Sequence, residues 1–174
     1  MKNIFKYMAV VAISLATFGL TSCEPESQPE PQPGTDTTYA ESTIYAFLSG
    51  GRTLAAGETV VYNLSDNDLQ NGEAKVDLFV KNKSDETQST VLKIERMEGP
   101  ESMNNIFFCH GTCKEVTCPY TSPAFQLAPG VDENVISLEF YPTERTGQSA
   151  TYKLTAGKGR NLEDPQVVLV NFNL

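Results

Sequence analysis

The chain has 174 residues, a formal net charge of −9, 40% hydrophobic residues, one His, no Trp and four Cys. This length suits one domain of ordinary size together with additional segments. The acidic balance argues against a nucleic-acid-binding protein, which needs a basic face. A single His leaves little material for a His-containing catalytic triad or a multi-His metal site.

Residues 1–22 have the features of a secretory signal peptide. A short basic head precedes residues 9–20, which are mostly apolar and carry no charge. This stretch is shorter than the roughly 20 apolar residues that a membrane-spanning helix needs. The sequence Leu-Thr-Ser-Cys, which ends at Cys23, resembles the lipobox of bacterial lipoproteins. The resemblance implies that residues 1–22 are removed and that Cys23 is lipidated and anchors the protein in a membrane.

A lipid anchor also predicts where the protein is located. Two or more acyl chains hold a protein stably at a membrane, and export places it where disulfides persist. Glu24 and Glu26 follow the Cys directly and resemble the surface-export signal of Bacteroidota lipoproteins. That resemblance implies an outer-membrane protein that faces outwards. The alternative is a solvated linker whose acidity only increases solubility.

Residues 23–38 are expected to form the lipidated Cys and an acidic, proline-rich tether. After Cys23 the segment contains Pro, Glu, Asp, Gln, Ser, Thr and Gly, with no aliphatic or aromatic residue. Such a composition cannot bury enough apolar surface to offset the entropy lost on ordering, and its prolines favour extended chain. From residue 39 onwards the composition becomes globular. We therefore expect residues 39–174 to form one domain.

The hydrophobic pattern of residues 39–174 predicts an all-β fold. Residues 74–80 give the clearest example, because Ala, Val, Leu and Val alternate with Lys, Asp and Phe. Similar β-rich runs occupy residues 43–49, 58–64, 89–97, 106–108, 124–128, 135–141, 150–154 and 167–172. We expect an immunoglobulin-like antiparallel β-sandwich of about seven to nine strands. A β-barrel lipid carrier is the alternative. Residues 66–72 contain too few apolar side chains for a helix and are predicted to form a loop.

Three cysteines, Cys109, Cys113 and Cys118, lie close together in the most distinctive stretch of the domain. If Cys23 is acylated, an odd number remains, so at most one intramolecular disulfide forms and one thiol is left over. All three pairings remain open at this stage. Each closes a small loop, which contributes about 2 kcal/mol by chain entropy and fixes a turn more than it stabilises the fold.

Catalytic and metal-binding roles are disfavoured for this stretch. Its Cys-x-x-x-Cys spacing occurs without the helix N-terminus that lowers a thiol pKa in redox enzymes. Together with His110, the three cysteines have the ligand types for zinc, but their spacing does not match paired zinc knuckles. We therefore expect a structural disulfide and no metal or other cofactor.

Acid–base catalysis is also disfavoured, because it requires two carboxylates that converge in a cleft. The acidic residues are expected in turns or on outward strand positions, as a solvated surface: Asp66, Asp68, Glu133, Glu139, Glu144, Glu163 and Asp164. Five aromatic residues could stack on sugars if they face outwards: Tyr39, Tyr45, Phe79, Tyr120 and Tyr141. Their alternative role is in the core or in strand pairing. We expect the protein not to be an enzyme.

Several small motifs together resemble a β-sandwich module of Bacteroidota secreted lipoproteins. They are Phe-Cys-His-Gly-Thr-Cys at residues 108–113, Leu-Ala-Pro-Gly at 127–130, Phe-Tyr-Pro at 140–142 and Asp-Pro at 164–165. His110 stands where such modules often carry Trp, and Cys118 is additional. The resemblance implies an Ig-like fold and an envelope location, and it implies no activity.

These observations predict a non-catalytic cell-surface lipoprotein that acts as a binding or assembly module of the bacterial envelope. Recognition through sandwich loops or an edge strand is the expected mechanism. Envelope proteins or glycans are the expected partners besides the membrane, and nucleic acid is not. The alternative is a glycan-binding accessory protein of a polysaccharide-uptake system. The sequence assigns no ligand-binding residue.

Overall fold

The computed structural model describes residues 38–130 and 135–174. The predicted signal peptide, Cys23 and all but the last residue of the predicted tether lie outside the described residues. Within the described ranges, no helix combines the length and the apolar character needed to cross a membrane.

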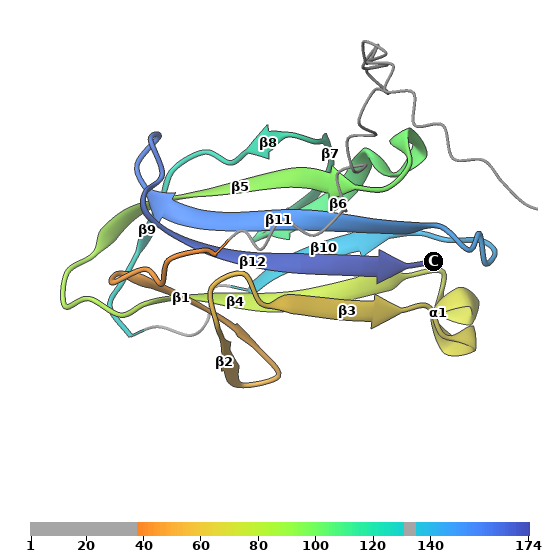
Figure 1. Ribbon diagram of the computed structural model, residues 1–174, viewed down its shortest axis with the longest axis horizontal. Coiled ribbons are helices and arrows are strands. Elements are labelled where there is room, and N and C mark those ends of the chain that lie inside the picture. Colours follow the sequence, from red (N-terminus) through yellow and green to blue (C-terminus); the bar gives the residue numbers. More distant parts are fainter. Residues whose placement is uncertain (1–37, 131–134) are drawn as a thin grey trace, which may run out of the picture. The chain divides into compact units, whose positions relative to one another are not determined.

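The described residues form two β-sheets that share one core (Figure 1). The first sheet contains, in spatial order, β2 (Arg52–Leu54), β1 (Tyr45–Ser49), β4 (Ala74–Asn82), β10 (Val135–Phe140), β6 (Asn105–His110) and β7 (Thr112–Thr117). The second contains β3 (Thr59–Asn63), β12 (Glu163–Asn173), β11 (Ser149–Lys158), β5 (Gln88–Glu98) and β8 (Tyr120–Thr121), and β9 (Phe125–Leu127) also pairs with β5. The named strands pair in antiparallel fashion except for β3, which runs parallel to β12.

The predicted all-β sandwich is confirmed. Nine of the described strands are five residues or longer, whereas β2, β8 and β9 have only two or three residues. Strand β4 shows why the alternating pattern was informative: Ala74, Val76, Leu78 and Val80 are buried, and the residues between them are exposed or half-buried. Because successive side chains of a strand point to opposite faces, one face of β4 packs into the core.

Aromatic side chains from both sheets fill the centre of the core. Tyr45, Phe47, Tyr152 and Phe172 are fully buried. The rings of Tyr152 and Phe172 meet edge to face with their centroids 6.2 Å apart. The Tyr152 hydroxyl donates a hydrogen bond to the backbone oxygen of Met103, in the short 3₁₀ turn η1 (Glu101–Met103). This bond satisfies a polar group that burial would otherwise penalise.

The loop predicted for residues 66–72 is wrong, because this segment contains a short helix, α1 (Asp66–Asn71). The Asp68 amide donates to the Ser65 hydroxyl (3.2 Å), and the Ser65 amide donates to the Asp68 carboxylate (2.8 Å). Gly72 ends the helix in the left-handed conformation, with φ of 66°. Helix α1 buries no side chain, so these caps stabilise it instead of an apolar face.

Replacing Ser65 with Ala is expected to lower the free energy of unfolding by about 1 kcal/mol, because the helix loses its N-terminal hydroxyl acceptor. Urea unfolding followed by circular dichroism measures the change. Asn67→Ala is the matched control, since Asn67 is exposed in the same helix and has no part in the cap. Equal losses in the two variants would contradict the capping role of Ser65.

Candidate functional site

The cysteine stretch folds into a tight β-hairpin made of β6 and β7. Gly111 forms the turn with φ of 75°, a conformation that glycine adopts without steric cost. Cys109 and Cys113 lie directly opposite each other on the two strands and form a disulfide. Of the three pairings that the sequence left open, the structure therefore has the one across the hairpin.

Cys118 is the remaining thiol of this stretch, and it is buried. Burial raises its pKa above the ordinary value for a thiol, and this effect outweighs the backbone hydrogen bond and the positive charge of Arg96. Since the thiolate is the reactive form, a raised pKa makes Cys118 a poor nucleophile. The geometry gives no support to a redox centre at this thiol.

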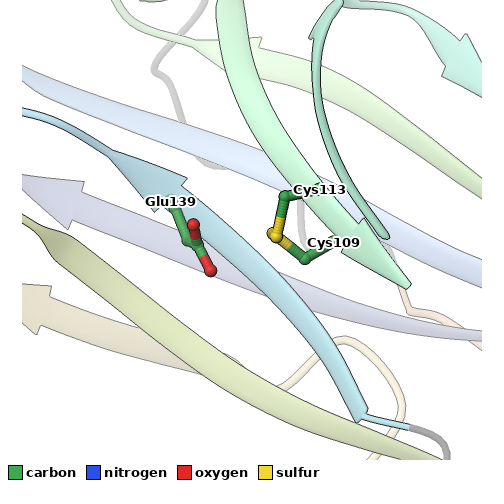
Figure 2. A group of neighbouring side chains, drawn as sticks. All are labelled: Cys109, Cys113 and Glu139. Carbon is green, nitrogen blue, oxygen red and sulfur yellow. A yellow bond between two sulfur atoms is a disulfide. The ribbon is translucent and has the colours of Figure 1, made fainter. Parts of the chain in front are cut away.

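Glu139 of β10 lies beside the disulfide, on the outer face of the first sheet (Figure 2). The expectation that Glu139 is solvated is wrong, because it is only 3% exposed. The Tyr141 hydroxyl donates to its carboxylate (2.8 Å), and the Lys75 ammonium lies 3.8 Å from the other oxygen. These two partners offset the cost of burying the charge.

This disulfide–carboxylate cluster brings together potential metal ligands. One atom each from Cys109, Cys113 and Glu139 lie within 4.8 Å of one another. Zinc binds cysteine as the thiolate, whereas both sulfur atoms are bonded to each other here. Among the described residues, neither His110 nor Cys118 belongs to this group. With the disulfide formed, the cluster is therefore a structural feature of the hairpin and not a zinc site.

A groove opens on the opposite side of β7, where the edge of the first sheet meets β8 and β9 of the second. It consists of two adjoining hollows of about 210 and 570 Å³. Both are lined by Lys114, Tyr120, Ser122, Pro123 and Ala124. The smaller hollow adds Phe108, His110, Thr112 and Phe125, and the larger adds Val91, Thr121 and Arg160. We call this region the β7 groove.

The β7 groove is positively charged in an acidic protein. Lys114 and Arg160 contribute the positive charges, and no Asp or Glu belongs to its lining among the described residues. Successive side chains of β7 point to opposite faces of the sheet. Thr112 and Lys114 therefore face the groove, whereas Cys113 and the acidic Glu115 face away from it. Lys114 and Arg160 lie far apart in the sequence, so no local pattern predicts that they line the same hollow.

The wall formed by residues 120–125 is held firmly on the second sheet. The Leu92 amide donates to the Ser122 hydroxyl (3.0 Å), which in turn donates to the Pro123 carbonyl (2.9 Å). The Tyr120 hydroxyl is buried and has no hydrogen-bond partner among the described residues. Because the two hydrogen bonds of Ser122 fix this segment on the second sheet, the groove has a pre-formed wall, as binding sites commonly have.

Aromatic rings in the groove are covered by other groups. The Lys114 ammonium lies 4.4 Å from the centroid of the Tyr120 ring, and the rings of His110 and Phe125 are 4.2 Å apart. Of the five aromatic residues proposed for sugar stacking, Tyr45 is fully buried, Tyr39, Phe79 and Tyr120 are half-buried, and Tyr141 is exposed. Tyr141 itself packs edge to face on Phe107, with centroids 4.7 Å apart.

Comparison with known proteins identifies the fold and no family. No protein-family model matches the chain, and no curated protein matches it. The N-terminal domain of PorA has a similar structure, with a TM-score of 0.56, 19% identity and coverage of 74% of this chain and 96% of that domain. A PapD-like domain of human CEP192 gives a TM-score of 0.40, 9% identity and coverage of 80% and 89%. The CooA pilin subunit of enterotoxigenic Escherichia coli gives a TM-score of 0.36 and 12% identity, with coverage of 75% of this chain and 98% of the pilin.

Proposed function

We propose that this protein is a non-catalytic lipoprotein of the bacterial outer membrane, anchored through Cys23 and facing outwards, that binds a partner through the β7 groove. The observation that carries the proposal is the groove itself. It has a pre-formed wall, two cationic side chains and an adjoining sheet edge. The lipobox at residues 20–23 supports the anchor.

The chemistry of the groove supports binding without catalysis. Hydrolysis by paired carboxylates requires two acidic groups at the site, and the described lining of the groove has none. The Ser122 hydroxyl already donates to the Pro123 carbonyl and accepts from the Leu92 amide, so it is held as a structural group. A cationic groove without an acid–base pair is suited to holding a ligand.

Metabolic labelling with palmitate tests the anchor. We expect the full chain to carry the label and to fractionate with the outer membrane, and Cys23→Ser to lose both properties completely. Globomycin should cause the unprocessed precursor to accumulate. Added protease should cleave the domain on intact cells if it faces outwards. An unlabelled wild-type protein would contradict the lipoprotein assignment.

The role of the groove in binding can be tested separately by placing a photo-crosslinking residue at Thr112, which lines it. We expect a discrete crosslink to an envelope component on intact cells. The same residue at Asn67, exposed on α1, serves as the control and should give none. Equal crosslinking from both positions would contradict binding through the groove.

Glycan binding by an accessory protein of polysaccharide uptake is the second candidate. The aromatic rings of Tyr120 and Phe125 in the groove favour it. Binding on a glycan array that is lost in Tyr120→Ala would support this candidate over the first. The positions of Lys114 over Tyr120 and of His110 against Phe125 weigh against it, because stacked sugars need an open ring face.

A further inference from the structure

Strand β7 is an edge strand with an open side. Among the strands of residues 38–130 and 135–174, it is the last of the first sheet and pairs with β6 alone. Five of its six residues are exposed, and Val116 alone is buried. Such a strand presents backbone N–H and C=O groups that another extended chain can pair with. Six residues provide about 20 Å of pairing edge. Strand β2, at the other end of this sheet, has only three residues.

Charge on the groove side of β7 selects the kind of chain that fits. Lys114 projects from β7 into the groove, and Arg160 lies at its other hollow. Because Glu115 points to the other face of the strand, it does not neutralise the positive charges of Lys114 and Arg160 on the groove side. An extended peptide carrying Glu or Asp at alternate positions would place its carboxylates along this side.

We propose that the β7 groove takes an extended acidic peptide segment of another protein, which pairs with β7 as an added strand and places its carboxylates near Lys114 and Arg160. This inference rests on the proposed function and names the chemistry of the partner. A peptide fits better than a sugar because the backbone edge is open while the Tyr120 and Phe125 rings are covered. The acidic, proline-rich tether predicted for residues 23–38 of this chain is a poor candidate for the added strand, since its prolines lack the N–H groups that strand pairing requires.

The test uses the full chain and a synthetic peptide of alternating Thr and Glu of about eight residues, a common strand length. We expect the peptide to slow amide hydrogen exchange in residues 112–117 and to bind more weakly as salt is raised. A peptide with Lys in place of Glu should do neither. Lys114→Glu and Arg160→Glu should each weaken binding by about ten-fold or more. Lys158→Gln, an exposed position outside the groove lining, should change it by less than about two-fold.

The following outcomes of these experiments would overturn the inference. Absence of protection in residues 112–117, or equal binding of the Lys peptide, would rule out an acidic strand. Oligogalacturonate that binds where the peptide does not would identify the partner as an acidic sugar. Dimerisation through β7 in sedimentation experiments would identify it as a second copy. If crosslinking from Thr112 persists while the peptide fails, only this inference falls and the proposed function stands.

Discussion

Replacing Gly157 with Ala is expected to lower the free energy of unfolding by about 3 kcal/mol, the upper end of the usual cost of overpacking. Gly157 lies in β11 at a β-bulge, where the turn between β11 and β12 folds back over it. A Cβ atom at this position would lie 2.6 Å from the Cα of Leu162. Backbone atoms cannot rotate away as a flexible side chain can, so the turn must move.

Gly159→Ala in the same turn is the matched control. Gly159 has φ of 61°, yet nothing lies within 4 Å of an added Cβ. The cost should therefore be only that of the left-handed backbone, about 1–2 kcal/mol. Urea unfolding of the two variants measures the difference. If Gly159→Ala lowers the free energy of unfolding more than Gly157→Ala does, backbone conformation matters more than the close approach of Leu162. That result would contradict the proposed role of Gly157.

The same substitution connects packing with the binding site. Arg160 lies in the turn that Gly157 allows to fold back, and it supplies one of the two positive charges of the β7 groove. We therefore expect a displaced turn to weaken the proposed peptide binding as well as the fold. The effect would arise through the position of Arg160, without any change in groove residues.

The strands could be predicted because their side chains obey a period of two. Leu92 and Ile94 of β5, and Ile136 and Leu138 of β10, occupy alternate positions of the β-rich runs at residues 89–97 and 135–141, and all four are fully buried. That prediction needs only the local sequence, since burial on one face of a strand leaves a local pattern.

The features that escaped prediction depend on groups that are distant in sequence or on single hydrogen bonds. Helix α1 forms because Ser65 and Asp68 cap each other, although its composition lacks an apolar face. From the sequence, Glu139 is expected at an outward, solvated position of a strand. It is buried because the cysteine hairpin, Lys75 and Tyr141 surround its side chain. The sequence signal for α1 was available in the Ser-x-x-Asp spacing, whereas none existed for Glu139.

The candidate site was the least predictable part. The sequence correctly drew attention to the cysteine hairpin, but it left three pairings open because pairing is decided by which strands oppose each other. Lys114 and Arg160 come together only because β7 and the β11–β12 turn lie at the same side of the sandwich. No spacing rule connects residues brought together by topology alone.

Asp164→Ala is the second substitution with a large expected effect, about 3 kcal/mol at neutral pH. The Asp164 carboxylate accepts hydrogen bonds from the amides of Thr43 (3.0 Å) and Ile44 (2.8 Å) and from the hydroxyls of Ser42 (2.9 Å) and Thr43 (2.9 Å). It was expected to be solvated, but it is half-buried and holds the start of the domain against β12. Removing it leaves several donors without their charged acceptor.

Asp164→Asn is the control, because Asn keeps one side-chain oxygen and tolerates the positive φ of 47° at this position. We expect it to lose about half as much stability as the Ala variant. Equal losses would show that the negative charge accounts for the whole effect, and no loss in either would contradict the anchoring role.

The pH dependence of this contribution has a definite sign. Burial on its own raises the pKa of Asp164, but the hydrogen bonds from Thr43, Ser42 and Ile44 outweigh it and hold the pKa below its ordinary value. The stabilisation is therefore complete above the unfolded pKa of about 3.9 and is lost as the pH falls through the lower folded value. The difference in unfolding free energy between wild type and Asp164→Ala should therefore narrow as the pH falls below about 3.9.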